Sequence, residues 1–260
     1  MKALTSRRHP AALVLLLLIG LLITGSVYAA LAPKQATAAN GSASQIEDGR
    51  KLFESNCSTC HGVQATGTPD GPSLVGVGAA AVDFQVGTGR MPMVAPGPQA
   101  PRIKTEMFDQ DQIDAMAAYV ASLAPGPSSP TADQIDASKG DAGKGGELFR
   151  VNCAMCHSSA GAGGALTRGK YAPGLKNVEP KHIYEAMQTG PQSMPVFNDK
   201  NITPDEKRDI IAYVQQTQEH ASTGGQSLGG YGPVPEGMFA WIFGMGLMVA
   251  AAVWAASRAN

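Results

Sequence analysis

The feature of this sequence that most constrains its fold is a segment that occurs twice. The first copy reads GRKLFESNCSTCH from position 49, and the second reads GGELFRVNCAMCH from position 145. Further matches follow both copies in the same order, with small differences in spacing: Pro72-x-Leu74 with Pro173-x-Leu175, Met91-Pro92 with Met194-Pro195, and Tyr119-Val120 with Tyr213-Val214. The chain therefore contains a duplicated domain, and its fold must be built twice.

All four cysteines of the chain lie in the repeated segment, as two Cys-x-x-Cys-His motifs. Two thiols three residues apart lie on one face of a helical turn. They can form thioethers to the two vinyl groups of a haem, and the following histidine then reaches the iron. The motifs predict two covalently attached haem c groups, held by Cys57, Cys60, Cys153 and Cys156, with His61 and His157 as axial ligands.

Two other uses of Cys-x-x-Cys are disfavoured. A zinc knuckle needs a second Cys or His pair at set spacing, and only His9, His182 and His220 lie outside the motifs, none of them repeated. A redox disulfide needs a βαβ context, which the sequence lacks. A haem also supplies apolar area to each repeat, which is small and poor in aromatic residues, so the haem interpretation is favoured.

The predicted sixth ligand of each iron is a methionine. Met91 and Met194 occupy equivalent repeat positions, and each precedes a proline. Thioether ligation opposite histidine gives an electron-carrying haem of raised potential. Met93 competes with Met91 in the first repeat, whereas Met107 and Met187 have no counterpart in the other copy.

A ligating histidine usually donates its second ring N–H to a carbonyl. Pro72 and Pro173 lie early in the loop after each motif, and they are the candidates for this role.

Helical patterns open and close each repeat. Leu52 and Phe53 are apolar in the segment before Cys57, and Ile113, Met116, Ala117 and Val120 recur at helical spacing near the end of the first copy. Asp109 with Gln112, and Thr203 with Glu206, are predicted N-terminal capping pairs of the closing helices. Tyr119 and Tyr213 are expected to pack these helices against Gly49 and Phe53 in the first copy and against Gly145 and Phe149 in the second. Little of the sequence alternates with period two, so an all-α fold with long irregular loops is predicted.

Two stretches are apolar enough for a membrane. No charge lies between Pro10 and Pro33, after Lys2, Arg7 and Arg8, which is compatible with either an uncleaved anchor or a cleaved signal peptide. The second stretch, Met238–Ser257, is also uncharged, has Trp241 and Trp254 near its ends, and is followed by Arg258. The positive-inside bias predicts a cytoplasmic C-terminus, with the repeats on the outer face of the cell membrane. A net charge of −1 gives no reason to expect a nucleic-acid partner.

The predicted organisation follows from these features. It comprises an N-terminal signal or anchor (1–33), a first domain (45–124), a Pro/Ser-containing linker (125–140), a second domain (141–221), a Gly-rich tether (222–236) and a transmembrane helix (237–257).

Each repeat resembles a class I cytochrome c domain, over residues 45–124 and 140–220. The whole layout resembles the dihaem cytochrome c subunit of the actinobacterial menaquinol–cytochrome c reductase, the cytochrome bcc complex. This resemblance implies a membrane translocase with a cytochrome b subunit and a Rieske iron–sulfur subunit as partners. The chain would pass electrons from the Rieske centre to a terminal oxidase, with no catalytic residue of its own. The Pro-rich stretch 95–101 departs from the simple class I pattern just after Met91.

Other functions remain open at this point. A dihaem subunit of a cbb-type oxidase or a membrane-tethered free electron carrier would carry the same motifs, although the C-terminal anchor speaks against the oxidase subunit. A dihaem peroxidase needs one iron with an open or labile sixth position. Both repeats offer a methionine for that position, which disfavours a peroxidase.

Overall fold

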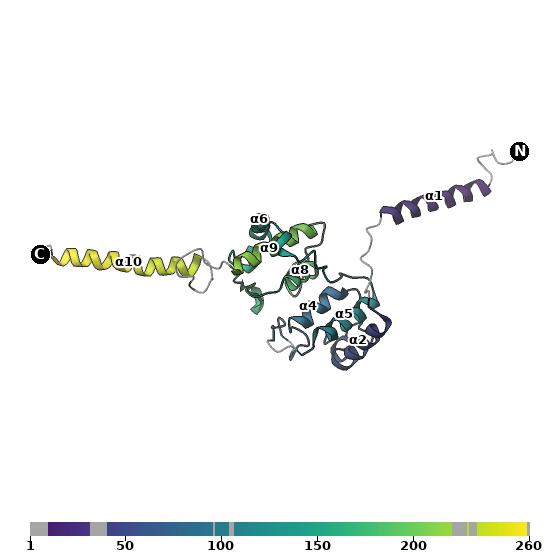
Figure 1. Ribbon diagram of the computed structural model, residues 1–260, viewed down its shortest axis with the longest axis horizontal. Coiled ribbons are helices and arrows are strands. Elements are labelled where there is room, and N and C mark those ends of the chain that lie inside the picture. The colour runs from purple at the N-terminus through teal and green to yellow at the C-terminus, as the bar shows by residue number, and fades with distance from the viewer. Residues whose placement is uncertain are drawn as a thin grey trace.

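The computed structural model describes residues 10–31, 41–95, 97–103, 107–219, 228 and 233–258. This part of the chain forms two helical bundles and two long apolar helices that project away from them (Figure 1). It is mostly helical, and its named strands are a single pair of two residues each, so the all-α prediction is confirmed. His9, His220 and most of the predicted tether 222–236 lie outside the described residues.

The two bundles repeat one order of helices. In the first bundle these are α2 (Ala43–Asn56), α3 (Ser58–His61), α4 (Gly78–Gly87) and α5 (Gln110–Leu123). In the second they are α6 (Ala142–Asn152), α7 (Ala154–His157), α8 (Pro180–Thr189) and α9 (Pro204–Glu219). The second bundle adds two 3-10 turns and an antiparallel pair of strands: η1 (Ala137–Lys139), η2 (Thr167–Gly169), β1 (Gly164–Ala165) and β2 (Tyr171–Ala172).

The closing helices begin where the capping pairs predicted. Asp109 accepts from the backbone N–H of Gln112, whose side chain accepts from the Asp109 backbone N–H, so both halves of a capping box are present. At the start of α9, the Thr203 backbone N–H donates to Glu206 at 2.7 Å, and the Glu206 N–H donates to the Thr203 hydroxyl at 3.3 Å. Each pair satisfies backbone donors that a helix start would leave free.

In each bundle the opening helix lies directly on the closing helix, and a glycine makes this crossing possible. A Cβ atom on Gly49 would lie 1.9 Å from the carbonyl oxygen of Ala115, and one on Gly145 would lie 1.9 Å from that of Asp209. One turn further along the closing helix, the ring of Tyr119 lies 5.3 Å from that of Phe53. The equivalent rings of Tyr213 and Phe149 are also 5.3 Å apart. The predicted tyrosine packing is therefore confirmed in both bundles.

Two helices in the middle of the repeats were not anticipated from the sequence, which led us to expect irregular loops there. α4 carries apolar residues on several sides, so it shows no helical stripe, and Val82 and Phe84 are buried. α8 does carry a stripe, because Ile183, Tyr184 and Met187 recur at helical spacing and are all buried. α4 and α8 pack against each other and join the two bundles (Figure 1).

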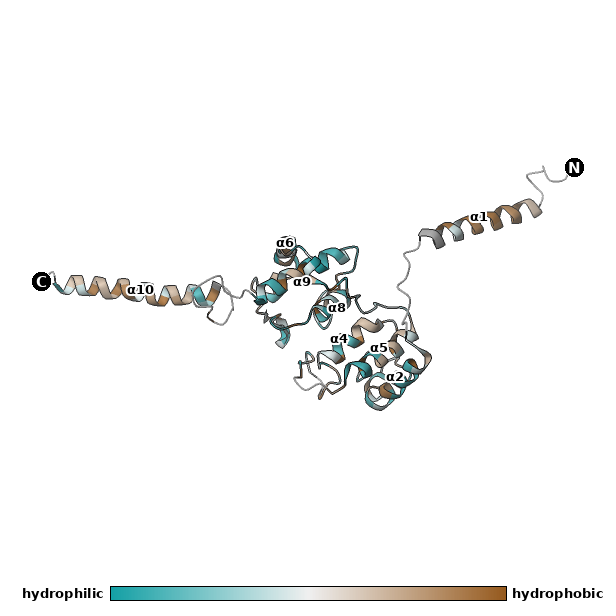
Figure 2. Cartoon of the chain, in the orientation of Figure 1, coloured by the Kyte–Doolittle hydropathy of each residue, from teal (hydrophilic) through white to brown (hydrophobic). Residues whose placement is uncertain are grey.

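The long helices α1 (Pro10–Leu31) and α10 (Pro233–Arg258) are the most hydrophobic parts of the chain (Figure 2). Of the described helices, α10 is long and apolar enough to cross a membrane, over Val234–Arg258. Its 25 residues would extend about 37 Å at about 1.5 Å per residue, against a hydrocarbon core of about 30 Å. The apolar part of α1 that can be assessed, Ala11–Val27, is shorter.

Replacing Gly145 with alanine should destabilise the second bundle by about 3 kcal/mol, because the added methyl overlaps a backbone oxygen and α6 must move off α9. Gly143→Ala is the control, since its Cβ would approach only the side-chain oxygen of Asp141, at 3.1 Å. Its unfolding free energy should stay within about 1 kcal/mol of the wild-type value. Guanidinium unfolding of the detergent-solubilised chain, followed by circular dichroism, measures both. Equal stability of the two variants would contradict the close crossing.

Candidate functional site

The second bundle contains a cavity around which four predicted site residues meet. Cys153, Cys156, His157 and Met194 all line it. Cys153 joins α6 to α7, and His157 is the last residue of α7. Met194 reaches the cavity from the loop between α8 and α9, where its backbone N–H donates to the Pro191 carbonyl at 3.0 Å. The motif at the start of α7 and the loop between α8 and α9 thus converge on one space.

Most of the remaining wall of this cavity is apolar, and one side of it is polar. Side chains from the helices of the second bundle supply the apolar part: Phe149, Ile183, Met187, Ile210 and Val214. Phe84, Arg90, Gln99 and Arg102 of the first bundle close another side. A porphyrin needs an apolar enclosure for its ring and polar or basic groups for its carboxylates. The lining, the paired thiols and the imidazole therefore fit the predicted haem.

The imidazole of His157 is held in one orientation and one tautomer. Its Nδ1 lies 2.9 Å from the carbonyl oxygen of Pro173. Since a carbonyl can only accept, Nδ1 carries the hydrogen and Nε2 keeps its lone pair for a metal. Burial also lowers the pKa of His157, against a smaller opposing effect of the Pro173 hydrogen bond. The ring is therefore a neutral, oriented donor.

The histidine of the first repeat makes the same hydrogen bond to a proline carbonyl. The Nδ1 of His61 lies 2.7 Å from the Pro72 carbonyl oxygen, so the predicted role of both prolines as hydrogen-bond acceptors is confirmed. His61 ends α3 as His157 ends α7, and each backbone N–H donates back to the first cysteine of its motif, at 3.0 and 2.9 Å.

Local chain geometry places these carbonyls. In the first repeat, a Cβ on Gly71 would lie 2.6 Å from the Cys60 oxygen, so the loop before Pro72 runs directly against the motif. In the second repeat, the β1–β2 pair turns the chain back so that Pro173 follows Ala172 at the motif. Gly163 permits this turn with a φ of +82°, and its N–H donates to the His157 carbonyl at 2.9 Å.

None of the four cysteines forms a disulfide. Burial raises the pKa of the Cys57 thiol to about 11, with a smaller contribution from Cys60. Burial likewise raises the pKa of Cys153 to about 11, helped by Cys156.

The candidate methionines differ in their settings. Met91 and Met93 both lie half-buried in the loop after α4, so burial does not separate them. The Met91 backbone N–H is held by the Gln85 carbonyl at 2.9 Å. Met107 is 62% exposed, whereas Met187 is 2% exposed and belongs to the core of the second bundle.

Sequence reasoning missed the contribution of the first bundle to the second cavity. Phe84, Arg90 and Arg102 belong to the first repeat, and no periodicity or motif links them to Cys153 or His157. Arg90 lies over the Phe84 ring at 4.8 Å, and burial lowers its pKa. The one sequence feature that pointed to contact between the repeats was the short linker, residues 125–140, which keeps them close together.

Comparison with known proteins agrees with this architecture. Residues 46–124 match the family model for cytochrome c. Residues 140–214 match the model for cytochrome c oxidase, cbb3-type, subunit III, which covers the second repeat alone.

Relatives that match nearly the whole chain are named cytochrome bc1 complex cytochrome c subunit. The protein of Mycobacterium bovis is 47% identical over 251 residues, which cover 94% of this chain and 89% of the relative. Those of Mycobacterium leprae and Corynebacterium efficiens are 46% and 45% identical, over 94% and 96% of this chain and 87% and 90% of their own lengths. The chain therefore belongs to the family of cytochrome bc1 complex cytochrome c subunits.

Proposed function

We propose that this chain is the dihaem electron-transfer subunit of a quinol–cytochrome c reductase. The observation that carries the proposal is the repeated histidine, whose Nδ1 donates to a proline carbonyl in both bundles. Each histidine follows two thiols, and in the second bundle the set faces a mainly apolar cavity that Met194 also lines. Haem supplies reversible one-electron oxidation and reduction of its iron when bound.

The residues have distinct roles in this proposal. Cys57, Cys60, Cys153 and Cys156 attach the haems covalently. His61 and His157 would supply Nε2 to the haem iron, and Met91 and Met194 would supply the second ligand of each iron. The carbonyls of Pro72 and Pro173 keep the imidazoles from rotating, which limits structural change between the two oxidation states. The apolar wall excludes water, and exclusion of water favours a raised potential.

The partners follow from the family. The relatives are named as subunits of the cytochrome bc1 complex, and such a complex contains a cytochrome b and a Rieske iron–sulfur subunit. We propose that the chain receives electrons from the Rieske subunit and delivers them to a terminal oxidase. The quinol chemistry and any translocation belong to the partners, since this chain contributes electron transfer.

The membrane arrangement supports a fixed position for this subunit. We propose that α10 is a transmembrane helix with Arg258, which lies over the Trp254 ring at 5.3 Å, at the cytoplasmic end. The two bundles then lie on the outer face of the cell membrane. Residues 1–33 act either as a second anchor or as a signal that is removed.

The purified chain should carry two covalent haems. Its intact mass should exceed that of the polypeptide by two haem masses, and haem staining should survive acid–acetone extraction. Replacing Cys57 and Cys60 with serine should remove one haem, and replacing Cys153 and Cys156 should remove the other. Recovery of free haem with an unmodified chain would refute the assignment.

The axial methionines can be tested by absorption in the near infrared, where thioether-to-iron charge transfer gives a weak band in the oxidised protein. Met194→His should remove one band and lower the potential of that haem. Met91→Leu should remove the other band, whereas Met93→Leu should leave it intact. Met155→Leu is a control, because this side chain lies within the second motif but is 91% exposed. The opposite result for Met91 and Met93 would assign Met93 as the ligand.

Deleting residues 237–260 should leave both haems attached and spectrally normal while sharply reducing quinol-to-oxygen electron flow in membranes. The physical reason is that tethering holds the haem domains near their partners at a roughly millimolar effective concentration. An unrelated apolar helix of equal length in place of residues 234–258 should restore the flow. Normal flux by the truncated chain at native abundance would favour a diffusing carrier.

A further inference from the structure

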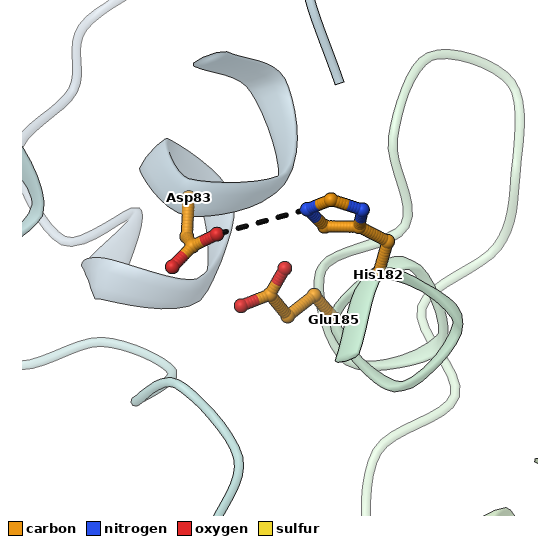
Figure 3. A group of neighbouring side chains, drawn as sticks. All are labelled: Asp83, His182 and Glu185. Atoms are coloured by element: carbon orange, nitrogen blue, oxygen red, sulfur yellow. Dashed lines mark ion pairs between the residues drawn. The ribbon is translucent and has the colours of Figure 1, made fainter. Parts of the chain in front are cut away.

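Three side chains with metal-binding atoms meet where the two bundles touch (Figure 3). Asp83 comes from α4 of the first bundle, whereas His182 and Glu185 come from α8 of the second. His182 and Glu185 are three residues apart, so they share one face of the helix. One ligand atom from each residue lies within 4.8 Å of the other two, and the His182 Nε2 is 3.8 Å from the Asp83 Oδ1.

The carboxylates of this cluster are buried and incompletely paired. Asp83 is 1% exposed and Glu185 is 0% exposed. Within the described part of the chain, the Asp83 Oδ1 and both carboxylate oxygens of Glu185 have no hydrogen-bond partner. Burial of an unpaired, charged carboxylate is strongly unfavourable. These oxygens are therefore open to a bound cation, with a proton on one carboxylate as the alternative.

The neighbouring donors do not supply that group, because they contact the other oxygen of Asp83. The Lys181 ammonium forms an ion pair with Oδ2, and the Gln110 side-chain amide donates to Oδ2 at 3.4 Å. Oδ1 is left facing His182 and Glu185. With both carboxylates ionised and Lys181 charged, the cluster has a net charge of −1, which favours a cation.

A glycine keeps the space beside these atoms open. Gly87 lies one helical turn after Asp83 on α4. A Cβ on Gly87 would lie 3.1 Å from the His182 Nε2 and 3.4 Å from the Asp83 Oδ1. A methyl group there would stand beside both atoms, whereas glycine leaves that side of the cluster free.

We propose that Asp83, His182 and Glu185 bind a Zn²⁺ ion between the two bundles. One imidazole nitrogen and two carboxylate oxygens are ligands that Zn²⁺ accepts, and a water would complete a tetrahedral shell. If the three ligand atoms were each 4.8 Å from the other two, every atom would lie about 2.8 Å from the centre of the triangle that they form. Ligand distances to zinc are about 2.0–2.2 Å, so each side chain would need to move by less than about 1 Å.

The protonation states of the cluster are compatible with this ion. Burial lowers the pKa of His182, which keeps its imidazole neutral and able to coordinate. Burial, aided by Asp83, raises the pKa of Glu185 to about 9. Without a cation, Glu185 therefore carries a proton at neutral pH, and zinc would displace that proton to solvent.

Such an ion would join the two repeats. Because the first bundle supplies one ligand and the second supplies two, zinc would stabilise the contact between α4 and α8. Phe84 of α4 and His182 of α8 also line the second cavity, so the ion would hold part of that cavity's wall in place. The zinc assignment does not depend on the identity of the electron donor or acceptor.

The test uses the complete chain with its haems attached, stripped of exchangeable metal by dipicolinate and then dialysed against micromolar Zn²⁺. Mass spectrometry of the metals should give one zinc per chain, with iron unchanged. The Glu185→Gln, His182→Gln and Gly87→Ala variants should each bind zinc at least about 10-fold more weakly. Glu147→Gln is the matched control, because this exposed residue lies on α6 and away from the cluster, and its affinity should not change.

Amide hydrogen exchange gives a second readout. Zinc should slow amide exchange in α4 and α8 of the wild-type chain and of the Glu147→Gln variant, but not in the Gly87→Ala variant. Normal haem spectra would establish that each variant is folded. Absence of stoichiometric zinc in the wild type would overturn the proposal, leaving a protonated Glu185 as the state of the cluster. Wild-type zinc affinity in the Gly87→Ala and Glu185→Gln variants would overturn it as well.

Discussion

The close contact between the first and last helix of each bundle is the constraint on which the rest of the structure depends. Gly49 and Gly145 let backbone meet backbone at these crossings. The opening helix ends at the first cysteine of the motif, so the crossing also fixes the position of Cys57 or Cys153. The same helix pairs are also packed together by aromatic rings, Phe53 on Tyr119 in the first bundle and Phe149 on Tyr213 in the second. The position of the motif is thus set by backbone packing and not by the motif itself.

The two repeats share this framework but differ in what surrounds it. Only the second bundle uses a β1–β2 pair to return the chain to the histidine, whereas the first uses a shorter loop in which Gly71 runs against Cys60. Both routes end with a proline carbonyl at the imidazole Nδ1. Two loops of different length therefore place a carbonyl acceptor at the histidine. This explains why the spacing between matched residues differs between the copies while their order is the same.

The contact between α4 and α8 makes the two bundles interdependent. It closes one side of the second cavity with residues of the first repeat, including Arg90 and Arg102. Asp83 of α4 and Glu185 of α8 are both buried at this contact. Duplication thus produced an interface whose polar groups belong to no single copy. An electron-transfer subunit benefits from such an interface, because electron transfer depends steeply on the distance between redox centres.

The sequence by itself determined the duplication, the all-α class, the capped starts of α5 and α9, the membrane-compatible C-terminus and the proline carbonyls beside His61 and His157. These features are local or repeated, so spacing and residue chemistry suffice to identify them. Tertiary structure alone decided the packing of α4 on α8, the shared wall of the second cavity and the meeting of Asp83 with His182 and Glu185. Residues 83 and 182 are far apart in the chain and occupy no equivalent repeat positions. Their proximity arises from the docking of two folded bundles, which no local pattern encodes.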